Sequence, residues 1–239
     1  MELRICHFYP DLLNLNGDYG NVSILSNRAK RYGIDVKVTT LTFGQRFIAD
    51  DYDFVFLGNG QPDELMAVLD ELSAYDKTEL KNYVDDNGVL LAVCGGYELL
   101  GEEIRFLDGN VKKGLGLLPV RFEKKEKRFI GNAVVQDGDN VYIGFENHDG
   151  CANIGALPPL GKVLLGFGNN ESGYEGCRFN GIIGTYLHGP LLAKAPELAD
   201  ELLVSALSKR YGDVTLPELD NTFEEKAREQ LLKRFFPTE

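Results

Sequence analysis

The sequence predicts an α/β protein with a central, largely parallel sheet, helices on both faces and an antiparallel β extension. In the first hundred residues, short apolar or β-branched runs alternate with amphipathic segments, as strands joined by helical crossovers do. After Leu100 the helical spacing stops, and β-like runs divided by glycines follow one another as in hairpins. We expect one domain over residues 1–239, a length that buries an ample core.

The first half of the chain is predicted to supply most of the parallel strands. Apolar and β-branched runs indicate strands at residues 3–8, 34–40, 53–57 and 89–93. Between them, apolar residues three and four positions apart indicate helices at residues 22–32, after Asp63 and around Leu80. Residues 9–21 form a long loop rich in Asn, Gly and Asp, and loops of this length often contact a ligand or partner.

The second half is predicted to hold the β extension, a last parallel strand and two closing helices. The β-like runs are at residues 117–123, 129–136, 141–148, 163–167 and 174–179. The run at residues 182–186 ends just before His188, Gly189 and Pro190. One helix should begin at Pro196 and another at Thr222, where Thr222 and Glu225 have the spacing of a capping box.

The main candidate for chemistry is Cys94. The apolar run at residues 89–93 stops there, two glycines follow, and Leu99 and Leu100 begin a helical pattern, which predicts a strand, a sharp turn and a helix. Such an elbow raises a nucleophile above the carboxyl edge of a sheet, and the next backbone N–H can stabilise an oxyanion. A helix start also lowers the pKa of a thiol from about 8.5. The alternative for Cys94 is a buried structural thiol.

Three histidines are available to act as a base for Cys94. His188 follows a predicted strand and can stand at the same sheet edge as Cys94, so it is the preferred general base and acid. His7 lies inside the first strand, where a packed or surface role is expected, and His148 is expected to support the pocket wall. A Cys–His pair can attack an amide carbon, protonate the leaving ammonia and then activate water against the thioester.

Composition narrows the classes of function. The chain has 25 basic and 37 acidic residues and a net charge of −12, which argues against a nucleic-acid partner. No signal-peptide pattern and no apolar run of membrane-spanning length is present, so a cytoplasmic protein is expected. The cysteines include no C-x-x-C pair, so reduced thiols are expected rather than disulfides or a metal site; Cys151 and Cys177 should be packed thiols.

Four segments carry a resemblance to a known family. Residues 94–101 read Cys-Gly-Gly-Tyr-Glu-Leu-Leu-Gly, residues 144–150 read Gly-Phe-Glu-Asn-His-Asp-Gly, and residues 185–190 read Thr-Tyr-Leu-His-Gly-Pro. They resemble the nucleophile, strand and histidine segments of class I glutamine amidotransferases in the cobyric acid synthase-like (CobB/CobQ) branch. The loop at residues 9–21 is similar to the start of the small glutaminase subunits (GatD) of bacterial lipid II isoglutaminyl synthases. The resemblance spans nearly the whole chain and implies the flavodoxin-like class I glutamine amidotransferase fold.

The resemblance also implies a function. L-Glutamine would be hydrolysed by a dyad of Cys94 and His188, and the ammonia would pass to a Mur-ligase-like subunit (MurT) in a heterodimer. That subunit would use ATP and Mg to amidate the α-carboxylate of D-glutamate in lipid II, giving D-isoglutamine for peptidoglycan synthesis. This chain has no Gly-x-x-x-x-Gly-Lys-Ser/Thr loop, so no cofactor is expected in it. The alternatives are a cobalamin-pathway-like or stand-alone amidotransferase domain, a non-catalytic binding module, or another hydrolase such as a cysteine peptidase.

Further residues are assigned by their positions in the family motifs. The backbone N–H groups of Gly95 and Gly60 would form the oxyanion hole. Arg128 would contact the α-carboxylate of glutamine, which suits a guanidinium with two parallel donors. Taken alone, Arg128 is one end of a charged run at residues 124–128, typical of a solvated surface.

The sequence departs from the usual class I pattern at two positions. Class I triads place Glu two residues after the histidine, but position 190 is Pro, so a dyad is expected. Glu146 and a backbone carbonyl are both candidates to hold the imidazole of His188. Glu98 stands where many relatives carry Gln, and it either meets the substrate ammonium or caps the helix after Cys94.

Overall fold

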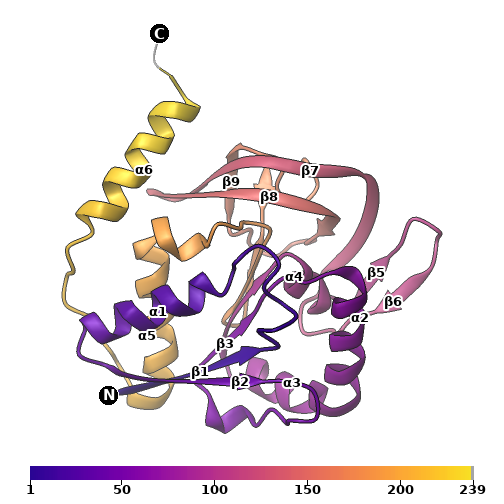
Figure 1. Cartoon of the computed structure of the whole chain (residues 1–239), viewed down its shortest axis with the longest axis horizontal. Helices are drawn as coiled ribbons and strands as arrows, with labels where there is room; N and C mark the ends of the chain where they lie inside the picture. The colour runs from indigo at the N-terminus through magenta and orange to yellow at the C-terminus, as the bar shows by residue number, and fades with distance from the viewer. Residues whose placement is uncertain (238–239) are drawn as a thin grey trace.

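The first sheet of the computed structural model, which describes residues 1–237, has six strands in the order β11-β12-β4-β3-β1-β2 (Figure 1). All neighbouring strands are parallel except β11 and β12. The central strands β3 and β4 are buried along their whole length because every residue in them is apolar. The predicted parallel sheet is confirmed, with β1 (Glu2–Phe8), β2 (Asp35–Leu41), β3 (Phe54–Leu57), β4 (Val89–Val93), β11 (Cys177–Phe179) and β12 (Ile182–Thr185).

Helices cover both faces of this sheet. α1 (Gly20–Arg31) and α5 (Pro196–Tyr211) lie on one side, and α2 (Pro62–Glu71) and α3 (Lys77–Asp85) on the other (Figure 1). A π-helical turn (Leu72–Asp76) joins α2 to α3, and 3₁₀ turns lie at Ala49–Asp51 and Leu191–Lys194. The helices bury the apolar stripes seen in the sequence. Among residues 1–237, none of the helices combines the length and apolar character needed to cross a bilayer.

A second sheet forms the β extension. Its core is a long antiparallel hairpin of β7 (Arg121–Asp137) and β8 (Asn140–Asn153), with a register shift between Lys124 and Phe129. β7 also pairs with β9 (Gly161–Leu165), which pairs with β10 (Tyr174–Glu175), and with β5 (Glu103–Arg105), which pairs with β6 (Val111–Lys113). All these pairs are antiparallel except β5 with β7, so the predicted extension is confirmed with one parallel pair in it.

Several expected boundaries were wrong. The helix after Cys94, α4 (Gly95–Leu99), begins at the first glycine and ends at Leu99. The runs at residues 117–123 and 129–136 are not separate strands, because β7 continues through the charged segment between them and residues 117–120 are outside any strand. The run at residues 174–179 is divided between two sheets at Gly176, whose φ of +59° interrupts the extended backbone. The hairpin of β5 and β6 was not predicted.

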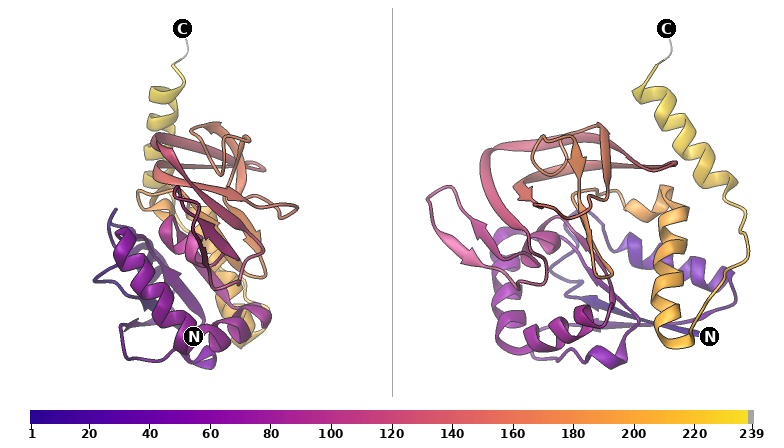
Figure 2. Two further views of the ribbon diagram at one scale, coloured as in Figure 1. Left: turned by 90° about the vertical axis from the view of Figure 1, so that its right-hand side faces the viewer. Right: turned by 180° about the vertical axis from the view of Figure 1, so that it is seen from behind.

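The last helix, α6 (Thr222–Phe235), is present where expected but does not pack as a core helix. The predicted capping box is absent, because the Thr222 hydroxyl donates to Asp220 at 2.5 Å and no side chain caps the helix. None of its residues is buried. Figure 2 shows from two further sides that α6 stands out from the rest of the chain.

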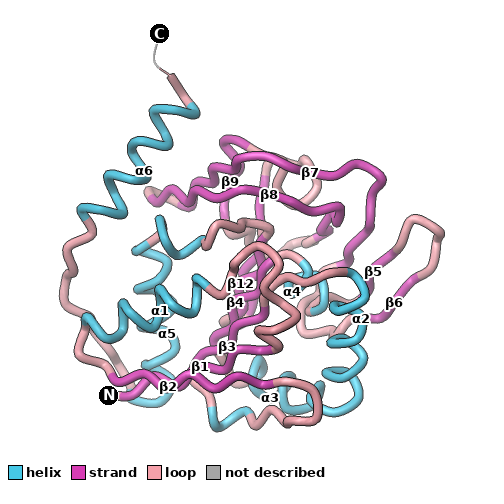
Figure 3. Tube along the Cα trace, in the orientation of Figure 1, coloured by secondary structure: helices cyan, strands magenta, loops and turns pink. Residues whose placement is uncertain are grey.

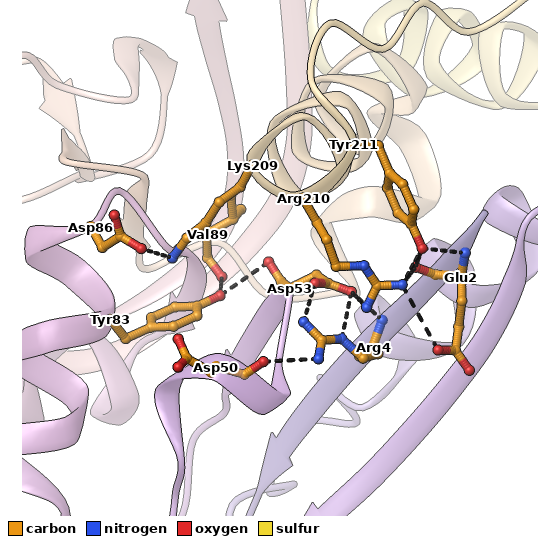
Figure 4. A network of polar contacts seen from close by, with 10 residues as sticks. All are labelled: Glu2, Arg4, Asp50, Asp53, Tyr83, Asp86, Val89, Lys209, Arg210 and Tyr211. Carbon is orange, nitrogen blue, oxygen red and sulfur yellow. Dashed lines mark hydrogen bonds and ion pairs between the residues drawn. The ribbon is translucent and has the colours of Figure 1, made fainter.

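A polar network binds the amino-terminal ends of the parallel strands to the end of α5 (Figure 4). The Asp53 carboxylate precedes β3 and pairs with Arg4 of β1 at 2.7 Å and with Arg210 of α5 at 3.5 Å. The Tyr83 hydroxyl lies 3.1 Å from the Asp53 carbonyl oxygen and 2.8 Å from that of Val89. This edge of the sheet is closed by structural contacts, and the opposite edge carries the loops with the candidate site residues.

Candidate active site

The candidate site lies where β3, β4 and β12 end. Cys94 follows β4 and His188 follows β12, and the parallel register places Thr185 beside Val93, so both residues emerge at the same edge. Asn59 follows β3 at this edge. The long loop between β1 and α1, drawn in pink in Figure 3, reaches the same place. The sequence-predicted convergence of strand-end residues is present.

The backbone at Cys94 makes the sharp turn that an elbow requires. Its φ of +52° and ψ of −111° are strained for a residue with a Cβ, and its N–H donates to the Thr185 carbonyl at 2.8 Å. At Gly96 a Cβ would lie 2.5 Å from the carbonyl oxygen of Leu57 at the end of β3. A glycine is therefore needed for α4 to approach β3 this closely.

The Cys94 thiol is only 4% exposed and lines a cavity of about 410 Å³. Burial raises the pKa of Cys94 well above its ordinary value, and the negative charge of Glu98, one helical turn away, raises it further. The expected lowering by a helix start is therefore wrong here, because α4 has only five residues and carries this carboxylate. The thiol is protonated at neutral pH in this structure, so attack on a substrate needs a base.

His188 is held by a carboxylate from the loop between β1 and α1. Its Nδ1 lies 2.8 Å from Oδ2 of Asp18, and both side chains are fully buried. The ring of Phe145 stacks on the imidazole at 5.3 Å between centroids, and the backbones of these two residues pair with each other. Asp18 lies 170 residues before His188, and no motif in the sequence indicated that the two meet.

The proposed role of Glu146 in orienting His188 is wrong. Its two carboxylate oxygens accept the backbone N–H groups of Phe167 at 2.8 Å and Gly168 at 2.6 Å. These bonds tie β8 to the segment after β9. Glu146 is a buried structural acceptor, and Asp18 fills the position for which it was considered.

The second ring nitrogen of His188 also has a partner. Nδ2 of Asn16 lies 3.1 Å from Nε2, and 3.3 Å from Nδ1. Because the Asp18 carboxylate accepts a hydrogen bond from Nδ1–H, Nε2 is the acceptor for the Asn16 amide. Sγ of Cys94 instead lies 4.0 Å from the Asn147 carbonyl oxygen, and among residues 1–237 it has no hydrogen bond to His188.

The backbone N–H of Gly95, a predicted oxyanion donor, is also occupied. It donates to Oδ1 of Asn59 at 3.0 Å. The carbonyl oxygen of Asn59 accepts the N–H of Leu15 at 2.9 Å, so the loop after β3 and the loop after β1 are joined. Gly60, the other predicted donor, lines the cavity. Asn59 was missed in the sequence, where it was one residue of a glycine-rich turn.

Charged side chains from the β extension form one wall of the cavity. The Arg128 guanidinium lines it and donates to Oδ1 of Asn147 through Nη2 at 2.8 Å. Lys124 lies 2.7 Å from both the nearly buried Glu98 and the part-exposed Asp149. Burial opposes the charge on Lys124, but the two carboxylates outweigh it and raise its pKa. Glu98 does not cap α4, so that alternative was wrong, while contact with a substrate ammonium stays a prediction.

The other two histidines are packed. His148 lines the cavity, stacks on Tyr186 at 3.8 Å between ring centroids, and its Nδ1 lies 2.8 Å from the Gly150 carbonyl. Burial lowers the pKa of His148 to about 4, so the ring is neutral. Burial likewise lowers the pKa of His7 to about 4 inside β1. Both are packed, as the sequence predicted, and among residues 1–237 neither has a hydrogen bond to Cys94.

Comparison with known proteins gives the family. Residues 4–196 match the model of the CobB/CobQ-like glutamine amidotransferase domain. A protein named lipid II isoglutaminyl synthase (glutamine-hydrolyzing) subunit GatD, from Streptococcus pneumoniae, is 36% identical over 96% of this chain and 90% of its own length. The protein of the same name from Staphylococcus aureus is 38% identical over 98% and 96%. A probable cobyric acid synthase from Methanococcus maripaludis is 32% identical, but over only 47% of this chain and 25% of its own.

Solved structures show the same fold at low sequence identity. The chain has a TM-score of 0.57 and 14% identity with a chain of the PurLQS structure from Thermotoga maritima, covering 87% of this chain and 99% of that one. A crystal structure of a glutamine amidotransferase gives 0.56 and 17%, covering 84% and 98%. The fold is therefore that of class I glutamine amidotransferases, as predicted. With the family model and the two full-length relatives, the chain belongs to the CobB/CobQ-like glutamine amidotransferase family, in the branch of the GatD subunits.

Proposed function

We propose that this chain hydrolyses L-glutamine through a Cys94 thioester and delivers ammonia to a second subunit in the cytoplasm. The observation that carries the proposal is an elbow cysteine on the cavity wall with a buried pair of His188 and Asp18 at the same edge of the sheet, in a chain of this family. His188 would take the thiol proton, and Sγ of Cys94 would attack the amide carbon. His188 would then protonate the leaving ammonia and activate water against the thioester.

The contacts around His188 set a condition on this mechanism. A base accepts a proton through a free lone pair, but Nε2 of His188 is bonded to the Asn16 amide in this structure. The Asn16 side chain must therefore leave Nε2 before the Cys94 proton is transferred. Binding of glutamine or of the partner subunit would move the Asn16 side chain away from Nε2, because the residue before it, Leu15, lines the cavity.

The acceptor of the ammonia is proposed from the names of the relatives. We propose a Mur-ligase-like partner (MurT) that uses ATP and Mg to amidate the α-carboxylate of D-glutamate in lipid II, for peptidoglycan synthesis. The two relatives named as subunits of lipid II isoglutaminyl synthase support this choice, since each matches over nearly its full length. Arg128 at the cavity wall is proposed to bind the α-carboxylate of glutamine.

The test is ammonia release from L-glutamine by the purified chain, alone and with a co-expressed Mur-ligase-like subunit. We expect release that Cys94→Ala abolishes and Cys151→Ala, a thiol outside the cavity, leaves unchanged. Stimulation by the partner would support the lipid II assignment. Release from a panel of peptides rather than from glutamine would favour a cysteine peptidase, and no Cys94-dependent turnover in either condition would contradict the proposal.

A further inference from the structure

The proposed mechanism assigns no role to the Asn59 side chain, although it lies at the candidate site. Asn59 follows β3, is 6% exposed and lines the cavity together with Cys94. Its Oδ1 accepts the Gly95 N–H at 3.0 Å. Because a backbone N–H can only donate, this bond fixes which end of the amide faces Gly95. The Nδ2 group, with two hydrogens, must then point elsewhere.

Nδ2 of Asn59 is a free donor at the cavity. Among residues 1–237 it has no hydrogen-bond acceptor, and it is not among the buried polar atoms that are sealed from solvent without a partner. Asn59 is nearly buried and lines the cavity, so the exposed part of its amide faces that space. Ligand groups that accept hydrogen bonds can therefore reach Nδ2 beside Cys94.

The loop that carries Asn59 is held in place on several sides. The Asn59 carbonyl accepts the Leu15 N–H at 2.9 Å. The neighbouring glycines, Gly58 and Gly60, lie so close to the carbonyl oxygens of Leu13 and Leu12 that a Cβ would collide with them. The donor is therefore positioned before any substrate binds, which is the condition under which a hydrogen bond to a developing charge is most effective.

We propose that Nδ2 of Asn59 donates to the oxyanion formed during glutamine hydrolysis, in place of the Gly95 N–H that Asn59 itself occupies. This inference rests on the proposed glutaminase function. As the bond between Sγ of Cys94 and the amide carbon forms, the carbonyl electron pair moves onto oxygen, and that oxyanion accepts a hydrogen bond from Nδ2. When the pair returns, the C–N bond breaks and ammonia leaves with the proton that His188 took from the thiol.

The Gly95 contact gives this donor additional strength. A hydrogen bond accepted by the oxygen of an amide draws electron density from its nitrogen, so the N–H groups become better donors. The positive end of the Gly95 N–H thus acts on the oxyanion through the Asn59 amide. Asparagine side chains serve as oxyanion donors in other hydrolases, where loss of one lowers kcat by about 10²- to 10³-fold.

The experiment compares acyl transfer with alkylation in Asn59 variants. In Asn59→Ala we expect kcat for ammonia release to fall about 100-fold or more, with KM little changed, because the donor acts on charge that develops in the transition state. Asn59→Asp keeps an oxygen for the Gly95 N–H but loses the donor, so it should lose at least as much. Asn170→Ala, in an exposed loop outside the cavity, is the control.

Alkylation of Cys94 by iodoacetamide supplies the second readout. This displacement at a saturated carbon forms no oxyanion, so its rate should be the same in the wild-type protein and in Asn59→Ala. Asn59→Asp is left out of this comparison, because a carboxylate beside Cys94 would itself raise the pKa of the thiol and slow alkylation. All assays use the chain with its co-expressed Mur-ligase-like subunit as well as the chain alone.

Three results would decide against the inference. An Asn59→Ala protein as fast as wild type, or faster, would mean that the side chain merely covers the Gly95 donor. If the rates of ammonia release and of Cys94 alkylation fell by the same factor in Asn59→Ala, Asn59 would only maintain the structure around the thiol. A wild-type protein without Cys94-dependent ammonia release would contradict the proposed function itself, before any Asn59 variant is compared, and the inference would fall with it.

Discussion

At the scale of single residues, the buried contact of His188 with Asp18 has the largest consequence for catalysis. Both side chains are fully buried, and Oδ1 of Asp18 has no hydrogen-bond partner among residues 1–237. Removing a carboxylate from water without satisfying all its lone pairs costs free energy. The contact with Nδ1 of His188 satisfies one of its oxygens and holds the imidazole in one orientation, which the proposed mechanism needs.

Replacing Asp18 tests this directly. In Asp18→Asn the amide can donate to Nδ1, which shifts the ring proton to Nε2 and leaves no lone pair there to accept the thiol proton. We expect kcat for ammonia release to fall by about 10²- to 10⁴-fold, as in other enzymes whose catalytic histidine loses the carboxylate that orients it. Asp11→Asn, an exposed residue of the same loop, is the matched control. Equal activity of the two variants would show that Asp18 has no role in the reaction.

The residues that sequence analysis found differ in kind from those that it missed. Cys94 directly follows a strand-like run and His188 comes two residues after one, so local pattern was enough to place them at one sheet edge. Asp18, Asn16 and Asn59 lie in loops whose composition indicates turns but not which side chain faces inward. Their contacts depend on how the loop after β1 folds against β12 and β3, and no local rule encodes that.

At the scale of elements, Glu175 joins the two sheets. It belongs to β10 of the second sheet and is fully buried, yet it accepts the Tyr186 N–H at 2.6 Å and the Thr185 hydroxyl at 3.0 Å, at the end of β12 in the first sheet. Burial raises the pKa of Glu175 to about 8. The carboxyl group is therefore protonated at neutral pH, and the junction of the sheets carries no charge at this point.

This junction should make stability depend on pH. The pKa of Glu175 rises from 4.5 in the unfolded chain to about 8 in the fold, so its contribution is complete below about pH 4.5 and is lost as pH rises through 8. Glu175→Gln keeps an oxygen acceptor and cannot ionise. The stability of wild type relative to Glu175→Gln, from urea unfolding, should fall by up to about 4 kcal/mol between about pH 5 and pH 8. The same difference at both pH values would contradict the assignment.

Element boundaries were predicted well where a local run of side chains marks the strand and poorly where the pairing partners decide. β3 and β4 were found because each is a continuous apolar run between breaks. β7 was divided at its charged segment, although the backbone runs through it and pairs with β8 on either side of a register shift. Membership of β10 and β11 in different sheets depends on a change of direction at Gly176. Pairing between strands that are far apart in the chain produces no periodic pattern in the sequence from which it could be predicted.

At the scale of the whole molecule, the two ends of the parallel sheet are built differently. The amino-terminal edge is fixed by the Asp53 network in Figure 4, which joins three strands to α5. The carboxyl-terminal edge is covered by loops whose polar side chains bond to the candidate catalytic groups. The contacts that occupy Nε2 of His188 and the Gly95 N–H are thus made by loop side chains rather than by strands, which suits a site that must release Nε2 of His188.

α6 belongs to neither edge of the parallel sheet. It is attached to the rest of the chain by polar contacts rather than by the burial of apolar side chains. Arg228 pairs with Glu197 of α5 at 2.8 Å, and Asn221 accepts a hydrogen bond from Arg28 of α1 at 2.9 Å. Phe223, in the first turn of α6, is 83% exposed. Ion pairs at such surfaces contribute only about 0 to 1 kcal/mol each. The folding free energy of the rest of the chain should therefore depend little on α6.

Removing residues 220–239 should lower Tm by no more than about 4 °C, because a loss near 1 kcal/mol shifts Tm by about 2–4 °C in a chain of this size. Leu203→Ala in α5, which deletes a fully buried side chain, is the comparison and should cost about 2–5 kcal/mol, a larger fall. Thermal unfolding followed by circular dichroism measures both. If the truncation lowered Tm as much as Leu203→Ala, α6 would have to cover apolar surface in solution that it leaves uncovered here.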